Sequence, residues 1–392
     1  MRASSAKRRV AAKRTKKAAP PERKAAALAT ARQEDRSKPK GATEPLANQF
    51  ANVMTWLGSP WPAAIAVSAG GDSVALMFLL ADWAAREVRS APIVLTVDHG
   101  LRPDSHKDAE HVRKLARSAG LEAHVLVWKG AKPSADIEAE ARAARYRLMG
   151  AWCAEKGAAA LYLAHTMEDQ AETFLLRLSR GSGLDGLSGM RSVAPLPLAE
   201  FSGVKLARPL LGIRRDELRT FLKNRGETWR EDPMNADPRF ARSRLRAEWP
   251  ALEKLGLTIP RVADAANHLA RAREALEEST DSVLQRAVRM RSQEAVLDPL
   301  RLKMQPREIG LRVLATVLSQ VSGEPYRPRF DSLERLFDSV VAGNLGGGAT
   351  LHGCKIGPAT VRDQVFGSAT LTISREPTRE AKEPSARAAR RR

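Results

Sequence analysis

The sequence predicts an α/β protein: a parallel sheet with helices on both faces, then a helical linker and a small C-terminal α+β domain. Three observations lead to this prediction. Short apolar runs alternate with longer amphipathic segments from residue 62 to about residue 179. A long amphipathic segment rich in Arg and Glu follows at residues 260–291. Residues 296–374 then combine two apolar helix patterns, at 307–321 and 329–342, with a strand pattern at 349–356. Strands separated by helices of this length indicate right-handed βαβ crossovers and hence a parallel sheet.

The first strand and the first helix are joined by a short loop of small residues. Apolar residues 62–67 predict the strand, and residues 74–80 have the apolar periodicity of a helix. The loop between them, named the phosphate loop, consists of Ser68, Ala69, Gly70, Gly71, Asp72 and Ser73. Its small side chains let a phosphate chain approach the backbone, and the amides that begin the helix attract anions. Asp72 is a candidate Mg²⁺ ligand, and Ser73 is a candidate donor to phosphate. The alternative is a tight strand-to-helix connection without a ligand.

Three more strand–helix pairs are predicted after the first. The strands lie at 93–97, 124–128 and 158–164, and the helices at about 105–119, 134–157 and 167–179. A further short helix is predicted at 213–225. Ligands of such sheets bind beyond the carboxyl ends of the strands. Each loop with chemically suggestive residues follows a strand, which is the arrangement that a single active site needs.

The helix after the fourth strand carries an imidazole and two carboxylates on one face. His165, Asp169 and Glu172 are spaced i, i+4 and i+7. Such a face could bind a cationic amine or remove its proton. The alternative is a solvated helix start, where the helix dipole favours acidic residues.

Two other groups of polar residues are candidates for phosphate contacts. His99 and Arg102 leave the second strand and could touch a nucleotide, although ordinary polar loop residues are the alternative. Residues 239–246 hold four arginines beside one phenylalanine. Guanidinium forks suit bidentate phosphate contacts, and a solvated basic helix face is the alternative.

Taken together, these stretches resemble the tRNA(Ile)-lysidine synthetases, a branch of the PP-loop (N-type) ATP pyrophosphatases. The S-G-G-x-D-S motif of that family is matched by the phosphate loop, with Ala69 in place of the first glycine. Further family motifs match in order: H-G-L-R-P at 99–103, A-R-x-x-R-Y at 141–146, H-x-x-x-D-Q-x-E-T at 165–173, R-P-L-L at 208–211, and E-D-x-S-N-x-D…R-N-x-x-R at 231–246. In the last motif Met234 and Ser243 stand where the family usually has Ser and Asn.

The resemblance implies a Rossmann-like parallel sheet of the PP-loop ATPase (adenine nucleotide alpha hydrolase-like) type. It also implies ATP-dependent modification of the wobble cytidine in the CAU anticodon of isoleucine tRNA. In that scheme ATP adenylates the C2 oxygen of cytosine and pyrophosphate leaves; the ε-amine of free L-lysine then attacks C2 and AMP leaves. ATP is the co-substrate, Mg²⁺ the cofactor, and a homodimer is one state that the resemblance allows.

The resemblance also implies roles for individual residues. The nucleotide-binding residues are Ser68, Ala69, Gly70, Gly71, Asp72, Ser73, His99 and Arg102, with Asp72 also the metal ligand. The catalytic residues are Asp72, His165, Asp169 and Glu172. The residues for tRNA or substrate contacts are Arg145, Asn235, Arg242 and Arg246.

The positive charge of the chain is concentrated near its ends. Lys and Arg total 65 and Asp and Glu total 45, which gives a net charge of +20 over 392 residues. Residues 1–42 hold 14 Lys and Arg against 3 Asp and Glu, and residues 375–392 hold 7 against 3. Such tails favour a polyanionic partner, a solvated extension is the alternative, and the first also resembles an organellar transit peptide.

These patterns predict a domain order. It consists of a disordered basic extension (1–42), a PP-loop ATP-binding catalytic domain (43–250), a helical linker (251–295), a C-terminal tRNA-recognition domain (296–374) and a disordered basic tail (375–392).

Composition narrows the setting and the rival functions. No run of 18 uninterrupted apolar residues is present, and no apolar signal segment begins the chain, so we expect no membrane association and a cytoplasmic location. Cys153 and Cys354 fit no metal spacing or disulfide framework, which disfavours a tRNA thiolase of the same superfamily. A glutamine-dependent amidating ligase would need an amidotransferase domain, which is not visible. A catalytically inactive basic RNA-binding protein is the rival from another class, and the intact acidic motif residues disfavour it.

Overall fold

A computed structural model describes residues 44–376, apart from 102–103, 131, 134–135, 231–236, 293 and 325. The predicted extension 1–42 and nearly all of the tail 375–392 lie outside the described residues. The chain forms two compact units. The first unit comprises Met1–Glu172 and Met190–Pro260, and the second comprises Thr173–Gly189 and Arg261–Arg392.

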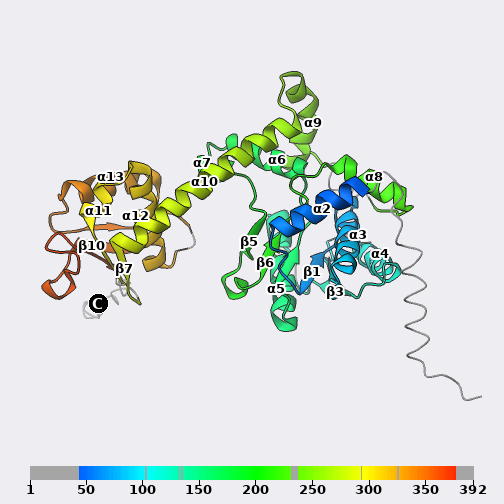
Figure 1. Ribbon diagram of the computed structural model, residues 1–392, viewed down its shortest axis with the longest axis horizontal. Helices are drawn as coiled ribbons and strands as arrows, with labels where there is room; N and C mark the ends of the chain where they lie inside the picture. The colour runs from blue at the N-terminus through cyan, green and yellow to red at the C-terminus, as the bar shows by residue number, and fades with distance from the viewer. Residues whose placement is uncertain are drawn as a thin grey trace, which may run out of the picture. The chain divides into compact units, whose positions relative to one another are not determined.

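The first unit is built on a six-stranded sheet (Figure 1). Its strands are β1 (Ala63–Ala66), β2 (Ile93–Asp98), β3 (Ala123–Val127), β4 (Ala160–Tyr162), β5 (Val193–Pro195) and β6 (Lys205–Ala207). Their order is β3-β2-β1-β4-β6-β5, with every neighbouring pair parallel except β5 and β6. The predicted parallel sheet is therefore confirmed. β5 and β6 were not predicted, because Pro195 interrupts the first and Lys205 begins the second, so neither shows the uninterrupted apolar run that predicted β4.

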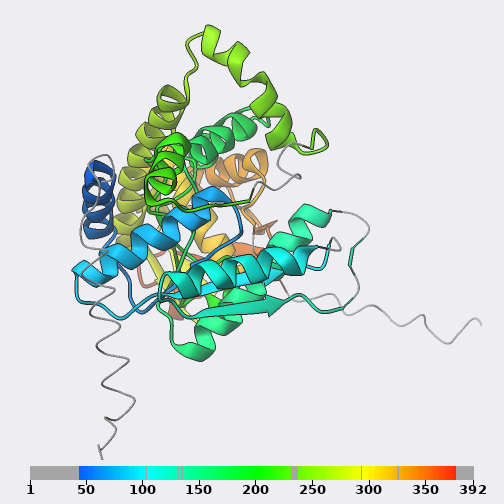
Figure 2. The same ribbon diagram turned by 90° about the vertical axis from the view of Figure 1, so that its right-hand side faces the viewer.

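Along the chain a helix follows each of the strands β1 to β4, and Figure 2 shows helices of this unit lying beside its strands. The helices are α2 (Glu44–Trp56), α3 (Gly71–Arg86), α4 (Ser105–Ser118), α5 (Ile137–Lys156), α6 (Met167–Leu178), α8 (Arg215–Arg225) and α9 (Ala241–Lys254). The periodicity of the sequence predicted α3 to α6 and α8 to within a few residues. Helix α6 begins in the first unit and ends in the second.

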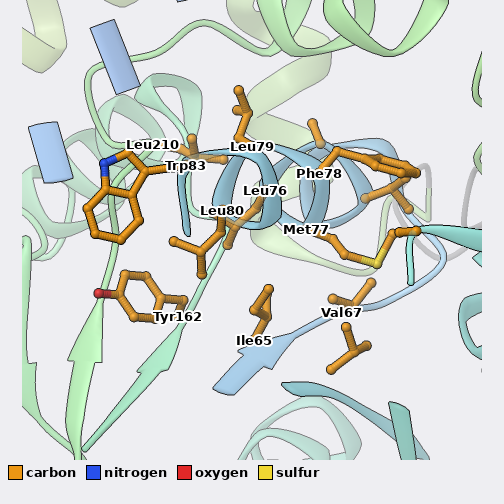
Figure 3. Packing of buried hydrophobic residues seen from close by; sticks show 14 of the residues in the cluster. Ile65, Val67, Leu76, Met77, Phe78, Leu79, Leu80, Trp83, Tyr162 and Leu210 are labelled. Atoms are coloured by element: carbon orange, nitrogen blue, oxygen red, sulfur yellow. The ribbon is translucent and has the colours of Figure 1, made fainter. Parts of the chain in front are cut away.

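Helices cover both faces of the sheet because its strands are apolar on both sides. Ala63 and Ile65 of β1 pack into the cluster that includes α3, whereas Ala64 packs into a second cluster with side chains of α5. Figure 3 shows the first cluster, in which Leu76 and Leu80 of α3 lie over the sheet. Burial on both faces leaves only the edges of the sheet available for polar chemistry.

The strand order creates a reversal point at β1. From β1 the chain adds β2 and β3 on one side and then returns to place β4 and β6 on the other. In open α/β sheets the crevice at such a switch point, beyond the carboxyl ends of the strands, is the usual ligand site. The phosphate loop leaves β1 at this edge, and residues 163–166 leave the neighbouring strand β4.

The second unit contains a small antiparallel sheet with helices, as predicted (Figure 1). Its strands, in the order β7-β8-β11-β10-β9, are β7 (Val288–Met290), β8 (Glu294–Leu297), β9 (Ala349–Leu351), β10 (Cys354–Pro358) and β11 (Leu371–Arg375). Its helices are α7 (Leu184–Leu187), α10 (Ile259–Ala287), α11 (Pro299–Lys303), α12 (Arg307–Ser322) and α13 (Phe330–Ala342). The first strand of this sheet lies inside the segment 251–295 that was predicted as a helical linker.

The prediction of one strand at 349–356 is wrong. The segment forms two antiparallel strands, β9 and β10, joined at His352 and Gly353. These two residues have φ of 55° and 70°, the left-handed pair that suits a tight hairpin turn. In the described part of the chain, no helix is both long and apolar enough to cross a membrane.

Candidate active site

The phosphate loop is closed by hydrogen bonds of Ser73. The backbone N–H of Ser68 donates to Ser73 Oγ over 3.1 Å. The Ser73 hydroxyl lies 2.7 Å from the Ser68 carbonyl oxygen and 2.9 Å from that of Gly70, so it donates to one or the other. Ser73 is buried, whereas Ser68 is exposed. The hydroxyl of Ser73 therefore stabilises the conformation of the phosphate loop, which leads directly into the first turn of α3.

Gly71 is explained by a close neighbour. A Cβ at Gly71 would lie 3.2 Å from the ring of Trp229. The backbone N–H of Arg230 donates to the carbonyl of Ala69 over 2.9 Å, so residues 229–230 lie against the loop. Ala69 itself is buried in the core and does not have a positive φ, so alanine replaces the family's glycine there without backbone strain.

A guanidinium joins the phosphate loop to α6. Arg215 Nε lies 2.9 Å from Asp72 Oδ2, and Arg215 Nη2 lies 3.3 Å from Asp169 Oδ1. The other oxygen of Asp169 accepts from the backbone N–H of Thr166 over 2.9 Å and from its hydroxyl over 3.2 Å. Asp72 and Asp169 therefore belong to one centre at the switch point of the sheet.

The next carboxylate along α6 binds a second guanidinium. Arg246 of α9 donates from Nε to Glu172 Oε1 over 2.6 Å and from Nη2 to Glu172 Oε2 over 3.1 Å. Arg246 Nη2 also lies 3.8 Å from Asp169 Oδ1. The side chain of Glu172 is 3% exposed and that of Arg246 is 32% exposed, so the carboxylate is desolvated while the guanidinium keeps access to solvent.

Burial and charge act in opposite directions on the two aspartates. Burial raises the pKa of Asp72 above its ordinary value, although Arg215 opposes this. Burial also acts to raise the pKa of Asp169, but the charge of Arg215 and the hydrogen bond from the backbone N–H of Thr166 outweigh it and lower that pKa. Asp169 is therefore the more firmly ionised of the two.

His165 is held as a neutral imidazole. Burial lowers its pKa well below the ordinary value, and the cations of Arg208, Arg142 and Arg242 lower it further. Its Nδ1 atom is buried without a hydrogen-bond partner among the described residues. A neutral ring with an unpaired nitrogen can accept or donate a proton for a bound substrate.

His99 and Arg145 form a second pair at the end of β2. Arg145 Nη2 lies 3.5 Å from His99 Nε2, and the ring of Trp128 packs edge-on against the imidazole at 5.9 Å between centroids. Burial, with the cations Arg145 and Lys132, lowers the pKa of His99 to about 4. This histidine is therefore neutral at physiological pH.

The structure brings together some predicted residues and separates others. Asp72, Asp169, Glu172 and Arg246 are linked by the contacts above, and Arg242 acts electrostatically on His165 and Asp169. His99 and Arg145 contact each other, and in the part of the chain that the structure describes neither forms a hydrogen bond or ion pair with this cluster. Arg102 and Asn235 lie outside the described residues.

Sequence reasoning missed three residues that shape the site: Glu168, Arg215 and Trp229. Glu168 Oε2 accepts from the backbone N–H of Arg215 over 3.0 Å, and its Oε1 accepts from Arg214 Nε over 2.8 Å. The one available signal was position, since Arg215 begins a helix shortly after the R-P-L-L motif. That motif follows β6, a strand too short to be predicted.

The donor set fits a magnesium ion that is shared with a nucleotide. Mg²⁺ in such sites takes one or two carboxylates together with substrate phosphates. Asp72 stands at the first turn of α3, and only its Oδ2 is engaged by a described residue. Its Oδ1 is the atom that would hold the ion.

Comparison with known proteins defines the class first. The sequence profile of the PP-loop domain matches residues 44–251, so the first unit carries the domain of PP-loop ATP-binding proteins. The U34-tRNA thiolase NcsA from Methanococcus maripaludis is similar in structure with a TM-score of 0.46 and 17% identity, covering 59% of this chain and 80% of that chain. This likeness is too weak to carry a functional statement.

Curated relatives then narrow the class. The tRNA(Ile)-lysidine synthase of Methylobacterium nodulans is 40% identical, covering 83% of this chain and 94% of the relative. The enzymes of the same name from Bradyrhizobium sp. and Wolbachia pipientis are 38% and 36% identical, covering 74% and 75% of this chain and 83% and 67% of the relatives. The chain belongs to the tRNA(Ile)-lysidine synthase family, whose members are ligases that form a carbon–nitrogen bond.

Proposed function

We propose that this protein ligates free L-lysine to C2 of the wobble cytidine in the CAU anticodon of isoleucine tRNA, with ATP as co-substrate. The C2 oxygen of cytosine attacks the α-phosphorus of ATP, and the bond to the β-phosphate breaks to release pyrophosphate. The ε-amine of lysine then attacks C2, the C2–O bond breaks, and AMP leaves with that oxygen. The names of the relatives support the tRNA and the product.

One observation carries the proposal: the phosphate loop and the acidic face of α6 meet in one centre. Asp72 and Asp169 share the guanidinium of Arg215, and the centre lies at the sheet's switch point. A ligase of this kind must hold an activated phosphate ester and an amine nucleophile at one carbon, and these two elements supply one partner each.

The side chains divide the work according to their charges. The amides at the start of α3 and the phosphate loop receive the triphosphate, and Asp72 would hold Mg²⁺, which supplies charge neutralisation when bound. The carboxylates of Asp169 and Glu172 attract the lysine ammonium, and the unpaired Nδ1 of the neutral His165 can accept a hydrogen bond from it. Arg246 exchanges its carboxylate partners for phosphate oxygens of ATP or tRNA, and Arg242 binds oxygens of the same kind.

The rest of the molecule serves the RNA in this proposal. The C-terminal sheet and its helices recognise the tRNA body, and the basic extensions at 1–42 and 375–392 raise its rate of association. We further propose that the protein acts in the cytoplasm and that it forms a homodimer.

The test is incorporation of labelled lysine. Purified protein is incubated with ATP, Mg²⁺, radiolabelled L-lysine and unmodified isoleucine tRNA bearing CAU. We expect ATP-dependent label in the tRNA and one AMP per lysine. Asp72→Asn should abolish the label, whereas Glu110→Gln, which changes an exposed carboxylate on α4, should leave it intact. No label with the wild-type protein, alongside a family member that works, would refute the proposal.

A further inference from the structure

Arg215 is the only described side chain that contacts both aspartates of the centre through an ion pair. Its two contacts come from different nitrogens of one planar fork, Nε to Asp72 and Nη2 to Asp169. The side chain of Arg215 is 20% exposed, and those of Asp72 and Asp169 are 26% and 11% exposed, so solvent screens these interactions only in part. Because the guanidinium is planar and rigid, a shift of one of these partly buried carboxylates should also shift the other.

The backbone of Arg215 is fixed from the same helix that supplies Asp169. Glu168 of α6 accepts the backbone N–H of Arg215 over 3.0 Å, and the N–H of Met167 donates to the carbonyl of Ile213 over 3.1 Å. The start of α8 is thus attached to the start of α6. The side chain of Arg215 reaches across from there to the first turn of α3.

Charge explains why a cation is needed at this point. Asp169 acts on Asp72 as a like charge, which disfavours having both ionised side by side. Arg215 neutralises that repulsion while fixing the separation of the two helices' first turns. A lysine could supply the charge, but its single nitrogen lacks the fork that spans two carboxylates.

We propose that Arg215 is a positioning residue that ties the nucleotide-binding half of the centre to the amine-binding half. Arg215 holds Asp72 and Asp169 at a fixed distance, so a change at Asp169 reaches the Mg²⁺–ATP site through the guanidinium. The inference rests on the proposed function for the identity of the two ligands. Its structural content, the coupling of Asp169 to the nucleotide, can be measured without tRNA or lysine.

The experiment is a double-mutant cycle on the full-length protein. The probe is Mg²⁺ with α,β-methylene-ATP, and calorimetry gives its Kd for wild type, Arg215→Ala, Asp169→Asn and the double variant. We expect Arg215→Ala to weaken binding about tenfold, and Asp169→Asn to weaken it about threefold only while Arg215 is present. Lys223→Ala, which removes an exposed cation from the same helix, should leave Kd unchanged.

Arg215→Lys separates charge from geometry. It keeps the cation and so should recover part of the lost affinity, but Asp169→Asn should still have no effect in its background. A purely structural role would lower the melting temperature without removing this dependence. The inference is overturned if the two substitutions act additively, if Lys223→Ala weakens binding equally, or if Arg215→Lys restores the full cycle. If the wild type incorporated no lysine, the proposed reaction would be refuted, but the coupling measured by the double-mutant cycle would still stand.

Discussion

At the scale of single residues, the phosphate loop owes its composition to its neighbours more than to unusual backbone angles. Neither Ala69 nor Gly71 has a positive φ. The hydroxyl of Ser73 lies within hydrogen-bond distance of two carbonyl oxygens of the loop itself. The indole of Trp229 leaves no room for a larger side chain at Gly71. The departure from the family motif at Ala69 is tolerated because that side chain points into the apolar core.

A Gly71→Ala substitution should therefore act through Trp229. The added Cβ would lie 3.2 Å from the indole, so the ring must move, at a cost of about 1–2 kcal/mol in the free energy of unfolding. Urea unfolding should show that Gly71→Ala costs less in a Trp229→Leu background. Gly70→Ala, whose Cβ would meet only Ser68 Oγ at 3.4 Å, is the matched control. Equal costs in both backgrounds would show that the indole is not the cause.

His99 should make the stability of the protein depend on pH. The folded protein keeps the pKa of His99 at about 4, whereas the unfolded chain has the ordinary value of 6.5. As the pH falls below 6.5, the unfolded chain takes up a proton that the folded protein refuses, so stability is lost down to about pH 4. These two pKa values alone would give about 2 kcal/mol between pH 7.5 and 5, and screening by solvent reduces this because the ring is only partly buried. Over that range wild type should therefore lose about 1 kcal/mol more than His99→Gln in urea unfolding. Parallel pH profiles for the two proteins would contradict this.

At the scale of elements, the start of α8 is held by a side chain of α6. Glu168 is 10% exposed and accepts both the backbone N–H of Arg215 and the Nε of Arg214. A charged acceptor at the first turn of a helix satisfies amides that have no partner within the helix. This contact joins the helix that carries Asp169 and Glu172 to the helix that carries Arg215.

Glu168→Ala should destabilise the protein more than Glu217→Ala, which removes a carboxylate within α8 that also accepts a backbone N–H at the start of this helix. Loss of two hydrogen bonds to a largely buried carboxylate should cost about 2–4 kcal/mol in urea unfolding. Glu217→Ala removes one contact, from the backbone N–H of Arg214 over 2.9 Å at an exposed position, and should cost about 1 kcal/mol or less. If the two variants unfolded alike, the contact from α6 would not be what fixes α8.

At the scale of the whole molecule, the charge belongs mainly to the extensions and the site to the first unit. Residues 1–42 hold 14 of the 65 Lys and Arg side chains. Because such side chains contact phosphates and not bases, their effect on RNA binding should be independent of the RNA sequence. The acidic centre, in contrast, lies at the sheet's switch point within the first unit.

Removal of residues 1–42 should weaken tRNA binding mainly at low salt. The slope of log Kd against log salt concentration should fall by roughly 2–5, because fewer counterions are released on binding. Filter binding at several salt concentrations measures it. A full-length variant with the 14 Lys and Arg of this segment changed to Gln should match the truncated protein. An unchanged slope in both would mean that the extension makes no phosphate contact.

The sequence by itself predicted the first four strand–helix pairs of the first unit and proposed Asp72, Asp169 and Glu172 as carboxylates of the site. Both are local: apolar periodicity spans a few residues, and His165, Asp169 and Glu172 lie within eight residues of one another. Its failures were local too. β5 and β6 are short and contain Pro195 and Lys205, so no apolar run marks them, and the hairpin at His352 has no Asn-Gly or Asp-Gly signature.

Only the tertiary structure decided which cations meet those carboxylates. Arg215 reaches Asp72 across 143 positions and Asp169 across 46, and Arg246 reaches Glu172 across 74. No spacing rule links such residues, because the return of the chain from β4 to β6 and on to α8 sets their distances. The sequence supplied the chemical groups. The parallel sheet brought the starts of α3 and α6 together, so that Asp72 and Asp169 share the guanidinium of Arg215.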